Sequence, residues 1–311
     1  MNPAETNAAI NRIKALDLQI VEKDEVLGRI SELKRHASIV LRLPADTVIC
    51  RSVNNFLPEQ RYPVTIQEVS YNPDFATCRF NRANWEGDSV FYGSISDDIM
   101  MSYHTSGLEI SGLMKNPNPL CSETVFVGKW VLQHDTEFVF VGGGDNLLKK
   151  TERTIKRNEA LVNHIVKYPE NVLSLKLIDS FLCNEFSKNV EDGRRWEYKL
   201  SAGYSTLVKG YSWPGILYPS VQSNGAGLNI AIFPQFVDDG LIKLEYIAAS
   251  IYYKRDKDIV NEYVMEARPD GEKLIWKEIY HHKLPPKMKA YYTGKSDDNS
   301  FGKYIPMTDL G

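Results

Sequence analysis

The sequence of 311 residues predicts an α+β fold, in which two groups of strands surround a central helical layer and a helical extension precedes them. Short segments rich in β-branched and aromatic residues lie between residues 47 and 142, and again between 215 and 253. Segments with a helical spacing of apolar residues lie between these two groups. A further segment of this kind covers residues 5–36 and predicts the extension.

The composition is typical of a folded globular protein. Hydrophobic residues make up 43% of the chain and charged residues 25%. The 37 Lys and Arg against 40 Asp and Glu leave a formal net charge of -3. This balance gives no electrostatic footprint for nucleic acid, which we do not expect as a partner.

Four cysteines and the absence of long apolar runs indicate the compartment. Cys50, Cys78, Cys121 and Cys183 are scattered, with no CxxC pair and no histidine at ligand spacing. They predict neither a zinc site nor a disulfide framework, and free thiols fit a reducing cytosol. No 18 apolar residues run together and the N-terminus lacks an apolar signal region. We therefore expect a cytoplasmic protein without a membrane partner.

The N-terminal segment predicts a kinked helix or a two-helix hairpin. Its apolar residues keep one spacing, stop at the charged "EKDE" and then resume; they are Ile10, Ile13, Leu16 and Ile20, followed by Leu27, Ile30 and Leu33. We expect a packed appendage, with a partner or self-association surface as the alternative.

Strands follow from residue 47. The first group consists of "TVICRSV", "VTIQEVSY", "SVFYGSI", "TVFVGKWVL" and "EFVFVGG", each bounded by Pro, Asn, Asp or Gly. "NLLKKTERTIKRNEALVNHIVKY" then predicts a half-exposed helix, whose basic cluster we interpret as a solvated face. "ENVLSLKLIDSFLCNEFSKNV" predicts a buried helix.

The second group of strands comprises "GILYPSV", "LNIAIF" and "LIKLEYIAASIYY", and a polar end follows it. We predict three parts: a helical extension over 1–46, a ligand-binding catalytic domain over 47–265, and a peripheral strand with a tail over 266–311.

Three short motifs are interpreted as structural. "VGGGDN" lacks the spacing of a phosphate-binding loop and predicts a turn. The adjacent His281 and His282 point to different faces of most backbones, which disfavours a shared metal site. His104 and Ser106 lack the glycine elbow of a serine nucleophile.

A set of separated segments stands in a recognisable order. Arg51 follows the strand "TVI", and Glu123 precedes the strand "TVFVGKWVL". "RANWEGDSVFY" carries Arg82, Asn84, Gly87 and Tyr92 at fixed offsets around a turn. "YPSVQSNGAGLNIAIF" carries Tyr218, Ser220 and Asn229.

This order resembles the RES domain, a family named for its arginine, glutamate and serine. The R-x-N-x-x-G turn before the tyrosine and the "YPS" before "N-x-A-x-F" are its two anchors, at 82–92 and 215–233. The resemblance covers roughly residues 47–250. It implies a split-sheet core similar to that of ADP-ribosyltransferases. It also implies an enzyme that degrades NAD by cleaving the nicotinamide–ribose bond, either as a glycohydrolase that releases ADP-ribose or as a phosphorylase that releases its phosphorylated form. NAD is then the substrate, and no metal is implied.

The family's residues are carried over position by position. Arg82 matches the family arginine, Tyr92 the aromatic residue and Ser220 the serine, and Arg51 matches a second arginine. Members are often toxins of bacterial toxin–antitoxin pairs, so the resemblance implies an antitoxin as a partner. As for any soluble enzyme, a small homo-oligomer is the default expectation.

The glutamate departs from the compact pattern. In compact members of the family it follows the tyrosine at an offset that, in this chain, falls on Ser102 or Tyr103. We therefore interpret residues 94–120 as an insertion and prefer Glu123, with Glu109 in reserve.

The residue types suit this chemistry. Guanidinium groups such as those of Arg82 and Arg51 bind phosphate oxygens in a bidentate manner. Tyr92 supplies a ring face, and a carboxylate stabilises the positive charge that develops on the ribose. Ser220 and Asn229 are predicted to bind the phosphates or the carboxamide, and Asn84 and Tyr218 complete the set.

Two other functions remain open at this point. The same pocket suits an enzyme that transfers ADP-ribose to a macromolecule. The displaced glutamate and the helical extension instead suit a non-catalytic nucleotide sensor or interaction protein.

Overall fold

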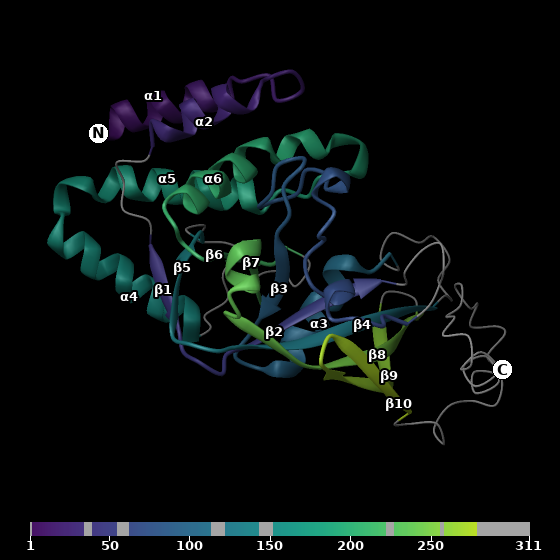
Figure 1. Ribbon diagram of the computed structural model, residues 1–311. Helices are drawn as coiled ribbons and strands as arrows, with labels where there is room; N and C mark the ends of the chain where they lie inside the picture. The colour runs from purple at the N-terminus through teal and green to yellow at the C-terminus, as the bar shows by residue number, and fades with distance from the viewer. Residues whose placement is uncertain are drawn as a thin grey trace.

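The computed structural model describes residues 2–33, 39–54, 62–112, 122–142, 152–221, 227–255 and 258–278. It confirms the α+β class, because the described part of the chain contains one large sheet and a set of α-helices (Figure 1). Both predicted groups of strands join this one sheet, so they do not surround a central helical layer. No helix in this part is both long and apolar enough to cross a membrane.

The described strands form one ten-stranded sheet in the order β1-β5-β6-β7-β3-β2-β4-β8-β9-β10. Among these neighbours only β5 and β6 run parallel. The strands are β1 (Val40–Leu43), β2 (Val48–Asn54), β3 (Phe91–Ile95), β4 (Ser122–Leu132), β5 (Thr136–Phe140), β6 (Gly215–Pro219), β7 (Leu228–Ile232), β8 (Ile242–Arg255), β9 (Asp258–Asp270) and β10 (Lys273–Glu278).

The N-terminal extension is a two-helix hairpin of α1 (Pro3–Lys14) and α2 (Lys23–Ser31). Asn2 and Glu5 form a capping box, in which each side chain accepts from the backbone N–H of the other, and this sets the start of α1. The hairpin buries Ile13 and Ile30 in a helical core. This agrees with a packed appendage.

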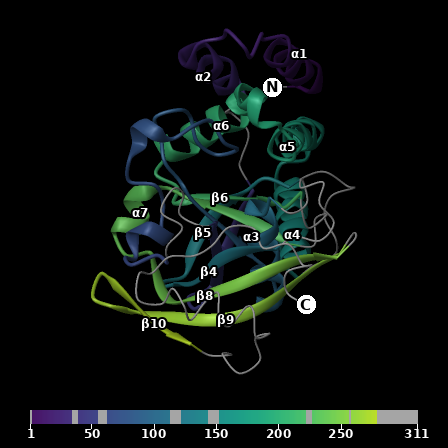
Figure 2. The same ribbon diagram turned by 90° about the vertical axis from the view of Figure 1, so that its right-hand side faces the viewer.

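The hairpin packs on a second helical layer, which separates it from the sheet (Figures 1 and 2). In this layer α5 (Val172–Phe186) contacts α1, and α6 (Lys199–Gly210) contacts α2. The buried face of α5 carries Leu175, Ile178, Leu182 and Phe186, as the apolar spacing predicts. The remaining described α-helices are α3 (Ile99–Ile110), α4 (Glu152–Lys167) and the short α7 (Pro234–Asp238).

Two segments contain helices that the sequence does not predict. Residues 94–120, interpreted above as an insertion, include the end of β3 and then α3, which packs against β2, β3 and β4. In "VTIQEVSY", a 3-10 helix (Gln67–Val69) replaces the expected strand, because the Glu68 carboxylate accepts from the backbone N–H groups of Val64 and Thr65.

The sheet crosses both predicted domain boundaries. β1 lies within residues 1–46 and pairs with β5, while β9 runs through positions 265 and 266. The boundaries therefore do not coincide with the edges of the sheet.

The sheet parts between β2 and β3. These strands share a single pair of facing residues, Cys50 and Ser94. Gly93 permits their close approach at that point, because a Cβ there would lie 2.5 Å from Cγ2 of Ile49 and 3.2 Å from the Cys50 carbonyl oxygen. Beyond this pair the strands diverge and leave room for a cavity.

Candidate functional site

A cavity of about 280 Å³ lies where β2 and β3 diverge. It is bounded by these strands, by the last turns of α3, by β6 and β7, and by the turn that follows Arg79. The described residues that line it are Arg51, Ser52, Asn81, Arg82, Tyr92, Gly93, Ser94, Ser106, Glu109, Ile110, Tyr218 and Asn229.

Arg51 enters the cavity from β2 and is held by three backbone carbonyls. Its Nε donates to the carbonyl oxygens of Val69 and Ser70 at 3.2 and 2.9 Å, and its Nη1 donates to that of Tyr92 at 2.7 Å. The guanidinium carbon lies 5.1 Å above the ring of Phe91. Burial lowers the pKa of Arg51 to about 10, so the group stays protonated at neutral pH. It brings a positive charge to the cavity.

Arg82 brings a second positive charge from the other side. Its Nε donates to the carbonyl oxygen of Phe186, the last residue of α5, at 3.0 Å, and its Nη2 donates to that of Lys188 at 2.9 Å. Its guanidinium carbon lies 5.4 Å above the Tyr198 ring. Within the described part of the chain, the hydrogen-bond acceptors of both Arg51 and Arg82 are neutral carbonyl oxygens. Neither charge is neutralised by a carboxylate there.

The turn between Arg82 and Tyr92 is built around Asn84. The Asn84 amide donates to three carbonyl oxygens, those of Arg79, Trp85 and Asp88. The Tyr92 hydroxyl donates to Asn84 Oδ1 at 2.7 Å and accepts from the N–H of Ala83 at 2.9 Å. Gly87 adopts a positive φ of 74°. Asn84 thus stabilises the turn but does not line the cavity, whereas Tyr92 stabilises the turn and also lines the cavity.

The carboxylate at the cavity is that of Glu109, near the end of α3. Its Oε1 accepts from the Ser220 hydroxyl at 2.6 Å and from the Asn229 amide at 2.8 Å. Asn229 Oδ1 in turn accepts from the Ser94 hydroxyl at 2.9 Å. Ser94, Asn229 and Tyr218 face one another across the neighbouring strands β3, β7 and β6. Strand register therefore brings these groups together.

Glu123, the preferred carboxylate, lies elsewhere. It is the second residue of β4 and lies opposite Tyr252 of β8, and its Oε2 accepts from the backbone N–H of Gly112 at 3.2 Å. It is not among the described residues that line the cavity. Helix α3 packs against β2, β3 and β4 and brings the reserve residue, Glu109, to the cavity instead.

The other predicted residues divide into two groups. Arg51, Arg82, Tyr92, Tyr218 and Asn229 line the cavity. Ser220 is fully buried behind it and reaches it through Glu109. Burial raises the pKa values of the Tyr92 and Tyr218 hydroxyls, so both rings stay neutral.

Four polar residues that line the cavity are not among the predicted site residues: Ser52, Asn81, Ser94 and Ser106. Ser94 follows Tyr92 by two positions on the same strand, a spacing that predicts one shared face. Ser106 was considered only with His104 as a nucleophile. Its hydroxyl instead lies 2.7 Å from that of Ser52.

No metal site emerges in the described part of the chain, because no group of three or more His, Cys, Asp or Glu residues lies close enough to hold an ion there. His281 and His282 lie outside the described residues.

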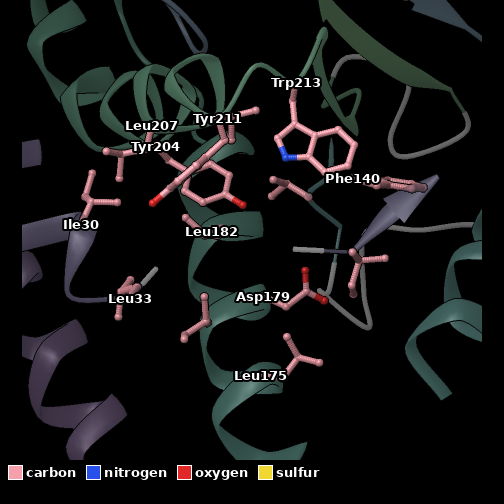
Figure 3. A pocket seen from close by; sticks show the side chains of 14 residues that line it. Ile30, Leu33, Phe140, Leu175, Asp179, Leu182, Tyr204, Leu207, Tyr211 and Trp213 are labelled. Carbon is pink, nitrogen blue, oxygen red and sulfur yellow. The ribbon is translucent and has the colours of Figure 1, made fainter. Parts of the chain in front are cut away.

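A second, smaller cavity of about 70 Å³ lies between α2, α5, α6 and β5 (Figure 3). Its lining is mainly aliphatic and aromatic, with Asp179 pointing in from α5 and Tyr204, Tyr211 and Trp213 on the opposite side. None of the predicted site residues lines it.

Comparisons with known proteins give little further information. No family model matches the chain, and no curated protein sequence matches it. Among solved structures, the chain is similar to one from a crystal structure of the M. tuberculosis MbcT-MbcA toxin-antitoxin complex. The TM-score is 0.34 and the identity 12%, over 73% of this chain and 93% of that chain.

Proposed function

We propose that this protein is an NAD-degrading enzyme that cleaves the bond between nicotinamide and ribose in the cavity between β2 and β3. The observation that carries the proposal is the placement of Glu109. Its carboxylate is fixed by Ser220 and Asn229 at the same cavity as two arginines that lack an anionic partner among the described residues.

The two guanidinium groups favour an anionic ligand. Both cations are partly buried and lose part of their hydration, which neutral carbonyl oxygens replace only in part. Phosphate oxygens near Arg51 and Arg82 would neutralise both charges, and a diphosphate offers oxygens to each. This supports a phosphate-bearing substrate.

The volume and the rings favour one half of a dinucleotide. Ligand pockets commonly enclose about 300–1,000 Å³, and this cavity of about 280 Å³ is near the lower limit. It suits a ring with its ribose rather than a whole dinucleotide, the rest of which would extend outside. Tyr92 and Tyr218 offer neutral aromatic side chains to the nicotinamide.

Glu109 supplies the group that acts on the reacting bond. As the bond between ribose C1′ and the pyridinium nitrogen breaks, its electron pair passes to the nitrogen, and neutral nicotinamide leaves. Positive charge then develops on the ribose, where a preorganised carboxylate stabilises it. Water adds its oxygen to C1′ and releases one proton to solvent, which yields ADP-ribose.

The resemblance to the RES domain supports two finer points of the proposal. The parting of the sheet at β2 and β3 fits the split sheet of ADP-ribosyltransferase-like folds. By the same resemblance, we propose that the protein acts as a toxin with a protein antitoxin.

The test is release of nicotinamide from NAD by the purified protein, followed by chromatography. Glu109→Gln keeps the shape of the side chain but removes its charge, and we expect kcat to fall about a hundred- to a thousandfold. Glu123→Gln is the matched control and should retain activity. Full activity in Glu109→Gln would remove the assignment of the carboxylate, and no release by the unaltered protein would remove the proposed function.

A further inference from the structure

We infer that Ser52 and Asn54, two residues of β2, position the carboxylate of Glu109 by holding the last turn of α3. The inference rests on the proposed function to the extent that Glu109 is the reacting carboxylate. Neither residue belongs to the set that the sequence pattern predicts.

Two hydrogen bonds connect β2 to the end of α3. The hydroxyl oxygens of Ser52 and Ser106 lie 2.7 Å apart, and both side chains are buried. The Asn54 amide donates to the carbonyl oxygen of Ile110 at 2.9 Å. Residues two apart on a strand share one face, so Ser52 and Asn54 meet the helix together.

Glu109 lies between the two helix residues that are held in this way. Ser106 precedes it by three positions, a spacing that puts both on one side of the helix. Ile110 follows it directly, and its carbonyl is one of the groups that a helix end leaves without an intrahelical partner. The two hydrogen bonds therefore fix both the rotation and the end of α3 on either side of Glu109.

The close seating of α3 on the sheet reinforces this arrangement. A Cβ on Gly107 would lie 2.2 Å from the Tyr252 hydroxyl oxygen, so only glycine lets the helix approach β8 so closely. β2 thus holds the backbone of Glu109, while Ser220 and Asn229 at β6 and β7 hold its carboxylate. Glu109 bridges the two sides of the opening in the sheet.

A displacement of about 1 Å in a reacting group can reduce the rate about a hundredfold. Loss of one neutral hydrogen bond leaves most of the folding stability in place. Ser52→Ala and Asn54→Asp should therefore fold but react slowly, since Asp keeps the shape of Asn without its N–H donors.

The experiment measures kcat and KM for NAD in the full-length protein. We expect Ser52→Ala and Asn54→Asp to lower kcat about ten- to a hundredfold with little change in KM. Ser52→Thr keeps the hydroxyl and should restore most of kcat. Thr47→Val is the control, because its hydroxyl makes an equally short hydrogen bond, 2.7 Å to the Pro44 carbonyl, outside the cavity.

Repeating the substitution in the Glu109→Gln variant distinguishes a positioning role of Ser52 from a general structural effect. In Glu109→Gln, adding Ser52→Ala should cause little further loss of kcat, because the serine acts through the carboxylate that is already absent. An equal loss in both backgrounds, or a loss confined to KM, would overturn the inference.

A third measurement tests the inference independently of activity. If the protein does not act on NAD, the proposed function is wrong, but this measurement still decides whether β2 holds the turn. Hydrogen exchange of the amides from Thr105 to Ser111 should be faster in Ser52→Ala and Asn54→Asp than in Thr47→Val. Unchanged exchange would show that β2 does not hold this turn and would overturn the inference.

Discussion

Arg51 has a structural role in addition to the binding role proposed for it. Its guanidinium donates to three carbonyl oxygens from two separate segments, those of Val69, Ser70 and Tyr92. A planar fork can do this, whereas a lysine ammonium is a single point charge on a flexible stem.

We therefore expect Arg51→Lys to lower the free energy of unfolding by about 1–3 kcal/mol, since buried carbonyls lose their donors. Urea denaturation measures the change. Arg42→Lys is the control, because Arg42 is exposed and pairs with Asp135, and its replacement should cost less than about 0.5 kcal/mol. Equal losses in both variants would contradict the role given to Arg51.

The residues of the turn before β3 show that a sequence motif does not reveal the hydrogen-bond partners of its side chains. Asn84 and Tyr92 stand at fixed offsets in the sequence, but their polar atoms bond to one another and to the backbone. The Ser220 hydroxyl likewise donates to a protein group, the carboxylate of Glu109. The spacing of a motif identifies neighbours, but it does not tell whether a polar atom faces a ligand or a protein group.

Among the elements, the α1–α2 hairpin forms a layer outside α5 and α6, and its apolar residues differ in exposure. Ile30 of α2 is 1% exposed and lines the smaller cavity beside Leu33 and Tyr204 (Figure 3). Ile20, in the loop of the same hairpin, is 74% exposed.

Ile30→Ala should lower the free energy of unfolding by about 2–5 kcal/mol, because it enlarges a cavity that is already present. Ile20→Ala should change it by less than about 0.5 kcal/mol. Denaturant unfolding of both variants provides the comparison. Similar values would mean that the hairpin contributes little to the fold.

Helix α3 shows why one element escaped prediction. Its sequence, "IMMSYHTSGLEI", is rich in Ser, Thr and Gly, which form helices poorly, and its apolar residues follow no clear period. Its N-cap Asp98 accepts from the backbone N–H of Met100, and packing against β2 and β3 supplies the rest. Local propensity therefore does not predict this helix, which depends on its tertiary contacts.

At the scale of the whole molecule, hydrogen bonds connect segments that are far apart in the sequence. Tyr71 donates its hydroxyl proton to both carboxylate oxygens of Asp238, at 2.7 and 2.9 Å, across 167 positions of sequence. Burial, with the hydrogen bond to Asp238, raises the pKa of Tyr71 to about 12.

This contact predicts a loss of stability in alkaline solution. In the unfolded chain Tyr71 ionises near a pH of about 10, whereas the folded protein keeps its proton up to about 12. The stabilisation is therefore complete below pH 10 and lost as the pH rises towards 12. Tyr71→Phe should show a smaller fall in unfolding free energy over this range. The control, Tyr211→Phe, alters an exposed ring and should follow the unaltered protein; a Tyr71→Phe curve that did the same would refute the linkage.

The sequence by itself determined the class of the fold, the helical N-terminal extension, the buried face of α5 and most of the strands, because periodicity and β-branched runs are local properties of a chain. It also pointed to Arg51, Arg82, Tyr92, Tyr218 and Asn229, which line one cavity. Only the tertiary structure decided which carboxylate joins them. Glu109 meets Ser220 and Asn229 across 111 and 120 positions, and that meeting depends on the path of α3 and on strand register, which no local pattern encodes.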